Sequence, residues 1–168
     1  MNRKIIFLGA LAVALLFVQS FGQMPEYVEL YKYLINLPGW KAVEPTGMNM
    51  SGPMGEMVTA QREYKNGTKA LTAQILSGTQ AQGMWAPFTT GMTFDTPDAF
   101  MKVTEIKGYH IGISHDKKEN SGGIVVPLKD VKSKVFVAFV LSYEGMSYQD
   151  ALTIAEKFPW KEMEKAFK

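Results

Sequence analysis

The sequence predicts an α+β fold in which an antiparallel sheet of about six strands is covered by N- and C-terminal helices. Apolar residues recur at helical spacing after residue 25 and again after residue 148. Between these segments, short apolar or alternating runs are separated by turn residues such as Asn66-Gly67. Strands joined by short turns pair antiparallel. The helices must bury their apolar stripes on the sheet, as a two-layer domain or, on opposite faces, as a helix–sheet–helix sandwich.

Residues 1–22 have the composition of a secretory signal peptide. A basic Asn-Arg-Lys start precedes an apolar run over residues 5–18, and small residues occupy the −3 and −1 positions of a cleavage site before Gln23. The run is shorter than the roughly 20 residues that a membrane span needs. We therefore expect a bacterial protein that is periplasmic or secreted, with residues 23–168 as one domain and no stable membrane anchor after cleavage. An uncleaved N-terminal anchor is the alternative.

Charge and cysteine content exclude several classes of function. Once Arg3 and Lys4 are removed, sixteen basic residues balance sixteen acidic ones. The chain then lacks the positive excess with which a nucleic-acid binder displaces counterions, so we expect no nucleic acid as a partner. The absence of cysteine excludes disulfides, thiol catalysis, thiolate zinc sites and iron–sulfur clusters.

The first half of the chain predicts one helix and a hairpin. The helix covers about residues 25–36, because Pro25 suits a first helical turn and Pro38-Gly39 ends the pattern. Residues 40–50 are expected to be extended, with a turn or bulge at Gly52-Pro53. Strands over residues 56–64 and 69–76 are joined by Asn66-Gly67, a strong hairpin signal.

The second half predicts an irregular segment, three strands and two helices. Residues 77–98 carry a short helical turn near 79–85 and form either a lid on the core or the wall of a pocket. A strand lies within residues 100–115, and Pro127 places the strand at 124–128 at an edge or kinks it. Residues 134–143 are apolar on both faces, which predicts a strand that is covered on both sides or central in the sheet. Ser147 caps a helix over residues 148–157, and a short last helix starts at Pro159.

Four methionines flank the breaker cluster Ser51-Gly52-Pro53: Met48, Met50, Met54 and Met57. A thioether is a soft ligand that suits Cu(I) or Ag(I). The spacing of the four methionines resembles that in methionine-rich segments of periplasmic copper-handling proteins. We expect no cofactor, and Cu(I) is the alternative. The other interpretation is that these adaptable side chains fill an irregular core or form a pliable contact surface.

The aromatic residues Trp40, Trp85, Phe88 and Phe94 are the candidates for lining an apolar ligand-binding cleft. The two histidines, His110 and His115, are five positions apart and therefore lie on opposite faces of one strand. They are poor joint ligands, and each is expected at the surface or in a turn.

No set of residues in the sequence indicates a reaction. The tripeptide Ser114-His115-Asp116 holds triad residue types, but neighbours in a strand point apart and triads assemble from distant positions. Phosphate-binding glycine motifs and the metalloprotease helix motif are missing from the sequence. The sequence therefore favours a protein that is not an enzyme.

The order of elements is similar to that of small exported α/β/α domains of the PsbP and Mog1 kind. The segment Leu37–Trp40, the methionine-bearing segment Gly47–Met57 and Arg62-Glu63-Tyr64 resemble a group of uncharacterised exported bacterial proteins. This resemblance implies export, but it brings no activity or site, since a fold does not determine a function.

Together, these features predict an exported, non-enzymatic protein that binds a partner protein or a small apolar ligand. The alternative is a periplasmic carrier of Cu(I) or Ag(I) that uses the methionine-rich segment.

Overall fold

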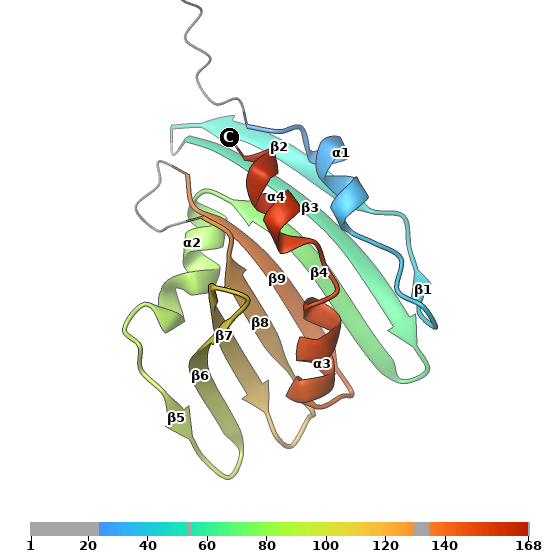
Figure 1. The fold of residues 1–168 in the computed structure, drawn as a ribbon, viewed down its shortest axis with the longest axis vertical. Helices are drawn as coiled ribbons and strands as arrows, with labels where there is room; N and C mark the ends of the chain where they lie inside the picture. The colour runs from blue at the N-terminus through green and yellow to red at the C-terminus, as the bar shows by residue number, and fades with distance from the viewer. Residues whose placement is uncertain (1–23, 54, 130–134, 168) are drawn as a thin grey trace, which may run out of the picture.

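The computed structural model describes residues 24–53, 55–129 and 135–167, and strands are its most common regular element (Figure 1). The strands are β1 (Lys41–Ala42), β2 (Thr46–Gly52), β3 (Gly55–Asn66), β4 (Lys69–Ser77), β5 (Phe94–Asp95), β6 (Ala99–Ile106), β7 (Tyr109–Asp116), β8 (Ser121–Pro127) and β9 (Val137–Glu144). The helices are α1 (Tyr27–Leu30), α2 (Thr79–Trp85), α3 (Tyr148–Ala155) and α4 (Trp160–Ala166), with 3-10 turns η1 (Tyr31–Tyr33) and η2 (Ala86–Phe88). The predicted signal peptide lies outside the described residues.

All of these strands join one antiparallel sheet. Its order is β1-β3-β4-β9-β8-β7-β6-β5, and β2 pairs with β3 on the same side as β1. The α+β class is confirmed, but the described sheet has nine strands, so the prediction of about six was too low. None of the helices in the described part of the chain is long and apolar enough to cross a membrane.

The main undercount is in residues 100–115, where one strand was expected and two are found. β6 and β7 form a hairpin whose turn residues, Lys107 and Gly108, both have positive φ, 54° and 81°. Glycine adopts this conformation readily, whereas lysine gives no turn signal in a sequence. The alternating pattern of the two strands was therefore read as a single strand.

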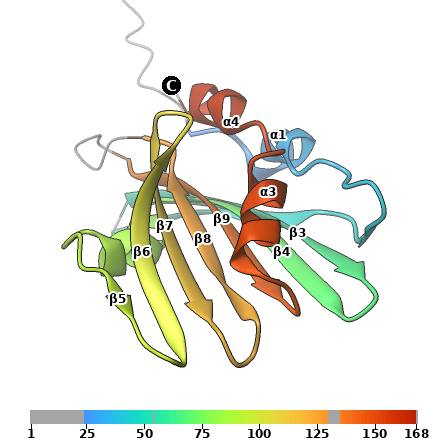
Figure 2. The same cartoon turned by 60° about the horizontal axis from the view of Figure 1, so that its bottom comes forward.

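Strand β9 lies in the middle of the sheet and is covered on both faces, as predicted. Val137, Phe139 and Leu141 belong to the core beneath α1, α3 and α4. Ala138 and Val140 point to the other face and pack with residues of α2 and η2. The terminal helices thus share one face, and the mid-chain helix α2 covers part of the opposite face (Figure 2).

The N-terminal helix is much shorter than the predicted span 25–36. α1 has four residues and continues for three more as η1. Side chains of the sheet bind the backbone of this segment: the Asn49 amide oxygen accepts from the N–H of Tyr27 at 2.8 Å, and the Arg62 guanidinium donates to the carbonyl of Leu34 at 2.7 Å. The first bond satisfies a donor at the start of α1 that has no intrahelical acceptor, and the second satisfies a carbonyl beyond η1, so the sheet holds this segment at both ends.

Several local predictions are confirmed. Asn66 pairs with Lys69 across the β3–β4 hairpin, and Gly67 has a φ of 60°. The Ser147 hydroxyl accepts the N–H of Asp150 at the start of α3, at 3.1 Å. The edge placement predicted from Pro127 is wrong, because β8 lies between β7 and β9 and the proline is its last residue. At the end of a strand, the backbone N–H that proline lacks is not needed to continue the hydrogen bonds of the sheet.

Candidate functional site

A cavity of about 950 Å³ lies at one end of the sheet. The β6–β7 turn, the residues that follow β8, and the start of α4 surround it, and Trp85 contributes from the end of α2. Figure 2 shows the tip of the β6–β7 hairpin rising toward α4. Four chain segments that are distant in sequence therefore meet at this end of the sheet.

Aromatic rings form much of the wall of this cavity. They are Trp85, Tyr109, Phe158 and Trp160. The Trp160 ring contacts Tyr109 edge to face, with ring centroids 5.7 Å apart, and packs on Phe139 at 6.4 Å. Such ring contacts add specific attraction to the burial of apolar area and hold the rings in place. The wall is therefore part of the packed core.

The sequence positions these rings through the short helix α4. Pro159 precedes the helix, and the buried side chains Trp160 and Met163 face the core with Phe167 behind them. These three residues form the apolar face of the short last helix that the sequence predicts to start at Pro159. Its first member lies where the helix meets the β6–β7 hairpin, so the ring that starts the helix also lines the cavity.

A hydrogen bond ties two lining residues together. The Tyr109 hydroxyl donates to a carboxylate oxygen of Glu164 at 2.8 Å. Burial, as the larger cause, and the neighbouring Glu164 carboxylate together raise the pKa of Tyr109 to about 12. The phenol therefore remains protonated at neutral pH and keeps donating to Glu164.

Lys107 lies above the aromatic wall. Its ammonium group is 5.5 Å from the centre of the Trp160 ring, and it donates to the backbone carbonyl of Glu156 at 2.8 Å. The Glu156 carboxylate is 3.4 Å away. The cation is thus held by three groups, and the ring contact is a cation–π interaction.

The indole N–H of Trp160 has no hydrogen-bond acceptor in the described part of the chain. The side chain is only 3% exposed, so water does not reach the N–H group freely. Buried donors in native proteins are nearly always bonded, and each exception needs an explanation. Here the exception lies in a residue that lines the cavity.

Acidic and imidazole groups also line the cavity, but the described residues do not combine them into a proton-transfer pair. Glu164 is bonded to Tyr109, and Glu162 accepts from Lys165 at 2.8 Å. His110 is exposed on β7 and forms no hydrogen bond to either carboxylate. These groups therefore take part in separate contacts beside the aromatic wall.

The four aromatic residues proposed from the sequence lie in different places. Trp85 lines the cavity, and Phe88 packs on it with ring centroids 5.4 Å apart, as part of the core beneath α2. Trp40 packs, partly buried, on the main core. Phe94 is 44% exposed on the short edge strand β5. The structure therefore brings Trp85 and Phe88 together, and it places Trp40 and Phe94 elsewhere.

Sequence reasoning missed three of the aromatic lining residues: Tyr109, Phe158 and Trp160. The sequence predicts only helices over residues 148–157 and from Pro159, and a strand within residues 100–115, at these places. Their helical and strand spacing gives no sign that they meet at an open end of the core. Only the three-dimensional arrangement reveals this.

Three of the candidate metal-binding methionines share one face of the β2–β3 hairpin. Met48 and Met50 are 54% and 51% exposed, and Met57 pairs directly with Met50. The Met57 sulfur accepts from the Thr79 hydroxyl at 3.1 Å. Met54 lies outside the described residues.

A fourth methionine comes near this group from a distant position in the sequence. Met24 lines a small hollow of about 220 Å³ together with Met50 and Met57. Within residues 24–53, 55–129 and 135–167, no group of three histidine or acidic side chains is arranged to hold a metal. Thioethers therefore provide the candidate soft-metal ligands, and no spacing rule would have included Met24.

The two histidines differ from each other in their surroundings. His110 is exposed, as predicted, but the surface or turn position predicted for His115 is wrong, because this side chain is buried. Its Nδ1 lies 3.0 Å from the hydroxyl of Tyr143, and the two rings are stacked. α3 covers this part of the sheet, which periodicity within β7 did not reveal.

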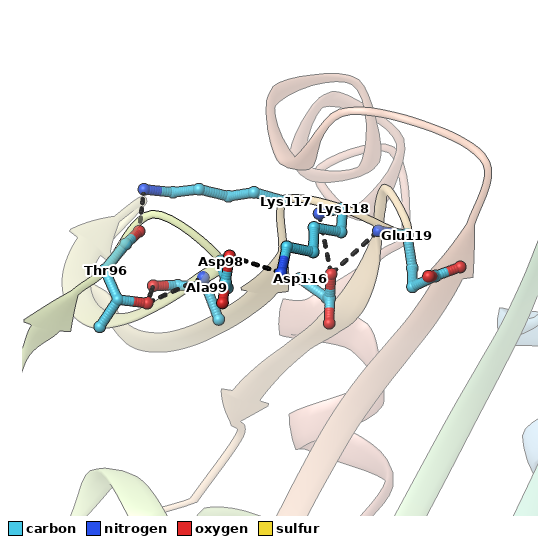
Figure 3. A network of polar contacts seen from close by, with 7 residues as sticks. All are labelled: Thr96, Asp98, Ala99, Asp116, Lys117, Lys118 and Glu119. Carbon is cyan, nitrogen blue, oxygen red and sulfur yellow. Dashed lines mark hydrogen bonds and ion pairs between the residues drawn. The ribbon is translucent and has the colours of Figure 1, made fainter.

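A polar network at the opposite end of β6 and β7 connects two turns (Figure 3). One carboxylate oxygen of Asp116 accepts the backbone N–H groups of Lys118 and Glu119, each at 2.9 Å. Lys117 donates to the carbonyl of Thr96 at 2.7 Å and pairs with Asp95. These contacts hold the turn after β7 and join it to the segment before β6.

In comparisons with known proteins, no family model matches the chain, and no curated protein or solved structure matches it either. The resemblance to exported bacterial proteins and the PsbP- and Mog1-like order of elements stay predictions. The geometry of the cavity is therefore the basis for assigning a function.

Proposed function

We propose that this is an exported, non-enzymatic binding protein whose ligand is a small molecule with a largely apolar body. The cavity of about 950 Å³ carries the proposal. Pockets that enclose small ligands typically measure about 300–1,000 Å³ and combine apolar walls with a few polar groups. The periplasmic or secreted location included here rests on the composition of residues 1–22.

The packing of the wall supports a preformed site. Trp160 is held between Tyr109 and Phe139 by ring contacts, and Trp85 is held by Phe88. Binding is weakened when side chains must be ordered, by roughly 0.5–1.5 kcal/mol for each flexible side chain. Rings that are already fixed avoid most of this cost. The small-ligand version of the hypothesis is thus the one that the cavity supports.

Titration with N-phenyl-1-naphthylamine, a neutral aromatic fluorophore, tests this proposal. We expect saturable binding of one molecule per chain. Trp85→Leu removes part of the wall and should weaken binding, whereas the matched variant Trp40→Leu changes a tryptophan outside the cavity and should not. Binding that does not saturate, or equal weakening by both substitutions, would overturn the proposal.

A second candidate function, binding of Cu(I) or Ag(I), is favoured by one observation. Met50 and Met57 are directly opposite in an antiparallel pair, and Met24 lines the same hollow. Opposite residues have Cβ atoms only about 4.5–5.5 Å apart, so two flexible thioethers can approach one ion. Soft monovalent ions are the ones that thioethers bind best.

Competition for Cu(I) against a chromophoric chelator tests this second candidate. The double variant Met50→Leu/Met57→Leu should lose the competition, and Met84→Leu/Met92→Leu, which alters exposed methionines elsewhere, should retain it. If the unmodified protein does not compete, the metal function is excluded. If it competes and the first variant does too, these methionines are not the ligands.

A further inference from the structure

We propose that the ligand of the cavity is an amphipathic organic anion, with its apolar body against the aromatic wall and its negative group near Lys129 and Lys161. This inference rests on the proposed function, because it concerns the same cavity. Carboxylate, phosphate and sulfonate head groups share the required chemistry, which is a negative charge spread over several acceptor oxygens.

The charges of the lining give the first argument. Three lysines and two glutamates belong to it. Both glutamates have partners of their own, since Glu164 accepts from Tyr109 and Glu162 pairs with Lys165. Neither carboxylate is therefore directed at the remaining lysines, and the cavity retains positive charge.

Two of the three lysines have no partner among the residues that the structure describes. Lys107 is held by Glu156 and by the Trp160 ring. Lys129 and Lys161 form no hydrogen bond or ion pair with any described residue. Next to an apolar wall the effective dielectric constant is lower than in bulk water, so these cations attract an anion more strongly than isolated surface lysines do.

A matched pair of probes separates the charge from the apolar body. 8-Anilinonaphthalene-1-sulfonate has the ring system of N-phenyl-1-naphthylamine with one added sulfonate. We expect the sulfonated probe to bind about tenfold more tightly than the neutral one, because it adds contacts to two partly exposed cations. Raising the salt concentration to about 0.5 M should reduce this preference, since screening acts on the charged probe alone.

The variant Lys129→Gln/Lys161→Gln should bring the affinities of the two probes within about threefold of each other. Lys65→Gln, which removes an exposed positive charge outside the cavity, should leave the preference unchanged. Equal affinities for the two probes in the unmodified protein would overturn the inference. A preference that persists in the double variant would overturn the assignment to these lysines.

The failure of this inference can be told apart from that of the proposed function. If the neutral probe binds in the cavity and the sulfonated probe binds no better, the cavity is a site for neutral ligands and only the inference fails. If neither probe binds with saturation, the proposed function fails as well. Displacement of the bound sulfonated probe is then measured with amphipathic carboxylates and, separately, with amphipathic phosphates. The class that displaces the probe at lower concentration has the preferred head group.

Discussion

The hydroxyl of Tyr109 donates a hydrogen bond to a carboxylate oxygen of Glu164, 2.8 Å away, and so joins β7 to α4. The two residues are 55 positions apart in sequence. Their contact lies in the lining of the cavity and closes it on the side of the last helix. The stability of that helix and the shape of the cavity are therefore linked.

The substitution Tyr109→Phe tests this link, because it removes only the hydroxyl. We expect the free energy of unfolding to fall by about 1.5–3 kcal/mol, the range for hydrogen bonds to charged groups. Urea denaturation measures the change. Tyr33→Phe is the control, since the Tyr33 hydroxyl has no hydrogen-bond partner in the described residues. Equal losses in the two variants would show that the Tyr109–Glu164 bond does not stabilise the fold.

The same tyrosine predicts how stability changes at alkaline pH. The pKa of Tyr109 is raised from 10.0 to about 12 in the folded protein, mainly by burial. Between these values the unfolded chain releases a proton that the folded chain keeps, so the contribution to stability is complete below pH 10 and is lost toward pH 12. The unfolding free energy of Tyr109→Phe should decline less steeply over this window. Parallel pH profiles for the two proteins would contradict the assignment.

Gly112 and Phe88 make a second testable contact. A Cβ atom on Gly112 would lie 2.5 Å from the Phe88 ring, so Gly112→Ala must displace this ring. We expect a loss of about 1–3 kcal/mol, typical of overpacking, and weaker binding of the neutral probe because Trp85 packs on Phe88. Thermal unfolding and titration measure both effects.

Gly123→Ala is the matched control for that substitution. Gly123 lies on the adjacent strand β8, and its added Cβ would meet its nearest neighbour, the Ser114 hydroxyl, at an ordinary distance of 3.6 Å. The change in stability should therefore stay within about 0.5 kcal/mol. A larger loss at Gly123 than at Gly112 would show that the Phe88 contact does not decide the outcome.

The sequence predicts those elements whose cause is local. In β9, every residue that packs in either of the two hydrophobic clusters is apolar. This continuous apolar run is the pattern from which its position in the sheet was predicted. The Asn66-Gly67 turn and the Ser147 cap follow from the chemistry of the residues themselves. In each case the signal lies within a few residues of the element that it defines.

Other features depend on contacts between distant residues and leave no local signal. The N-terminal segment is bound at its two ends by Asn49 and Arg62, which come from the sheet. The Lys107-Gly108 turn lacks the usual residue at its first position. The aromatic wall brings Tyr109 and Trp160 together because the β6–β7 hairpin reaches α4. The pattern of a single sequence carries no information about contacts between such distant residues. Among the aromatic residues that line the cavity, only Trp85 was therefore predicted to bind a ligand.

Arg62 is predicted to hold the N-terminal segment on the sheet. Its Nε donates to the carbonyl of Val43 at 2.8 Å and its Nη1 to that of Leu34 at 2.7 Å. Lysine keeps the charge but has a single ammonium group that does not span both carbonyls. We therefore expect Arg62→Lys to lose about 1.5–3 kcal/mol of stability. Hydrogen exchange should also become faster in residues 34–43.

The control for Arg62→Lys is Lys65→Gln, an exposed change on the same strand. It should alter stability by less than about 0.5 kcal/mol and leave hydrogen exchange near η1 unchanged. Unchanged exchange in Arg62→Lys would mean that the segment is held by other contacts, such as the Tyr64 hydroxyl on the carbonyl of Ile35.

The lowered pKa of Asp116 predicts how the stability of the protein changes at acidic pH. The N–H groups of Glu119 and Lys118 bind its carboxylate and lower its pKa below the ordinary 3.8. A lowered pKa in the folded state stabilises the protein above pH 3.8, and this contribution is lost as the pH falls through the folded-state pKa. Asp116→Asn keeps an acceptor for both N–H groups without titrating, so its stability should decline less than that of the unmodified protein below pH 3.8. Glu105→Gln, which alters an exposed acid on β6, should follow the unmodified protein instead. Chemical denaturation at a series of pH values measures all three. If Asp116→Asn loses stability on acidification as steeply as the unmodified protein, groups other than Asp116 govern the acid limb.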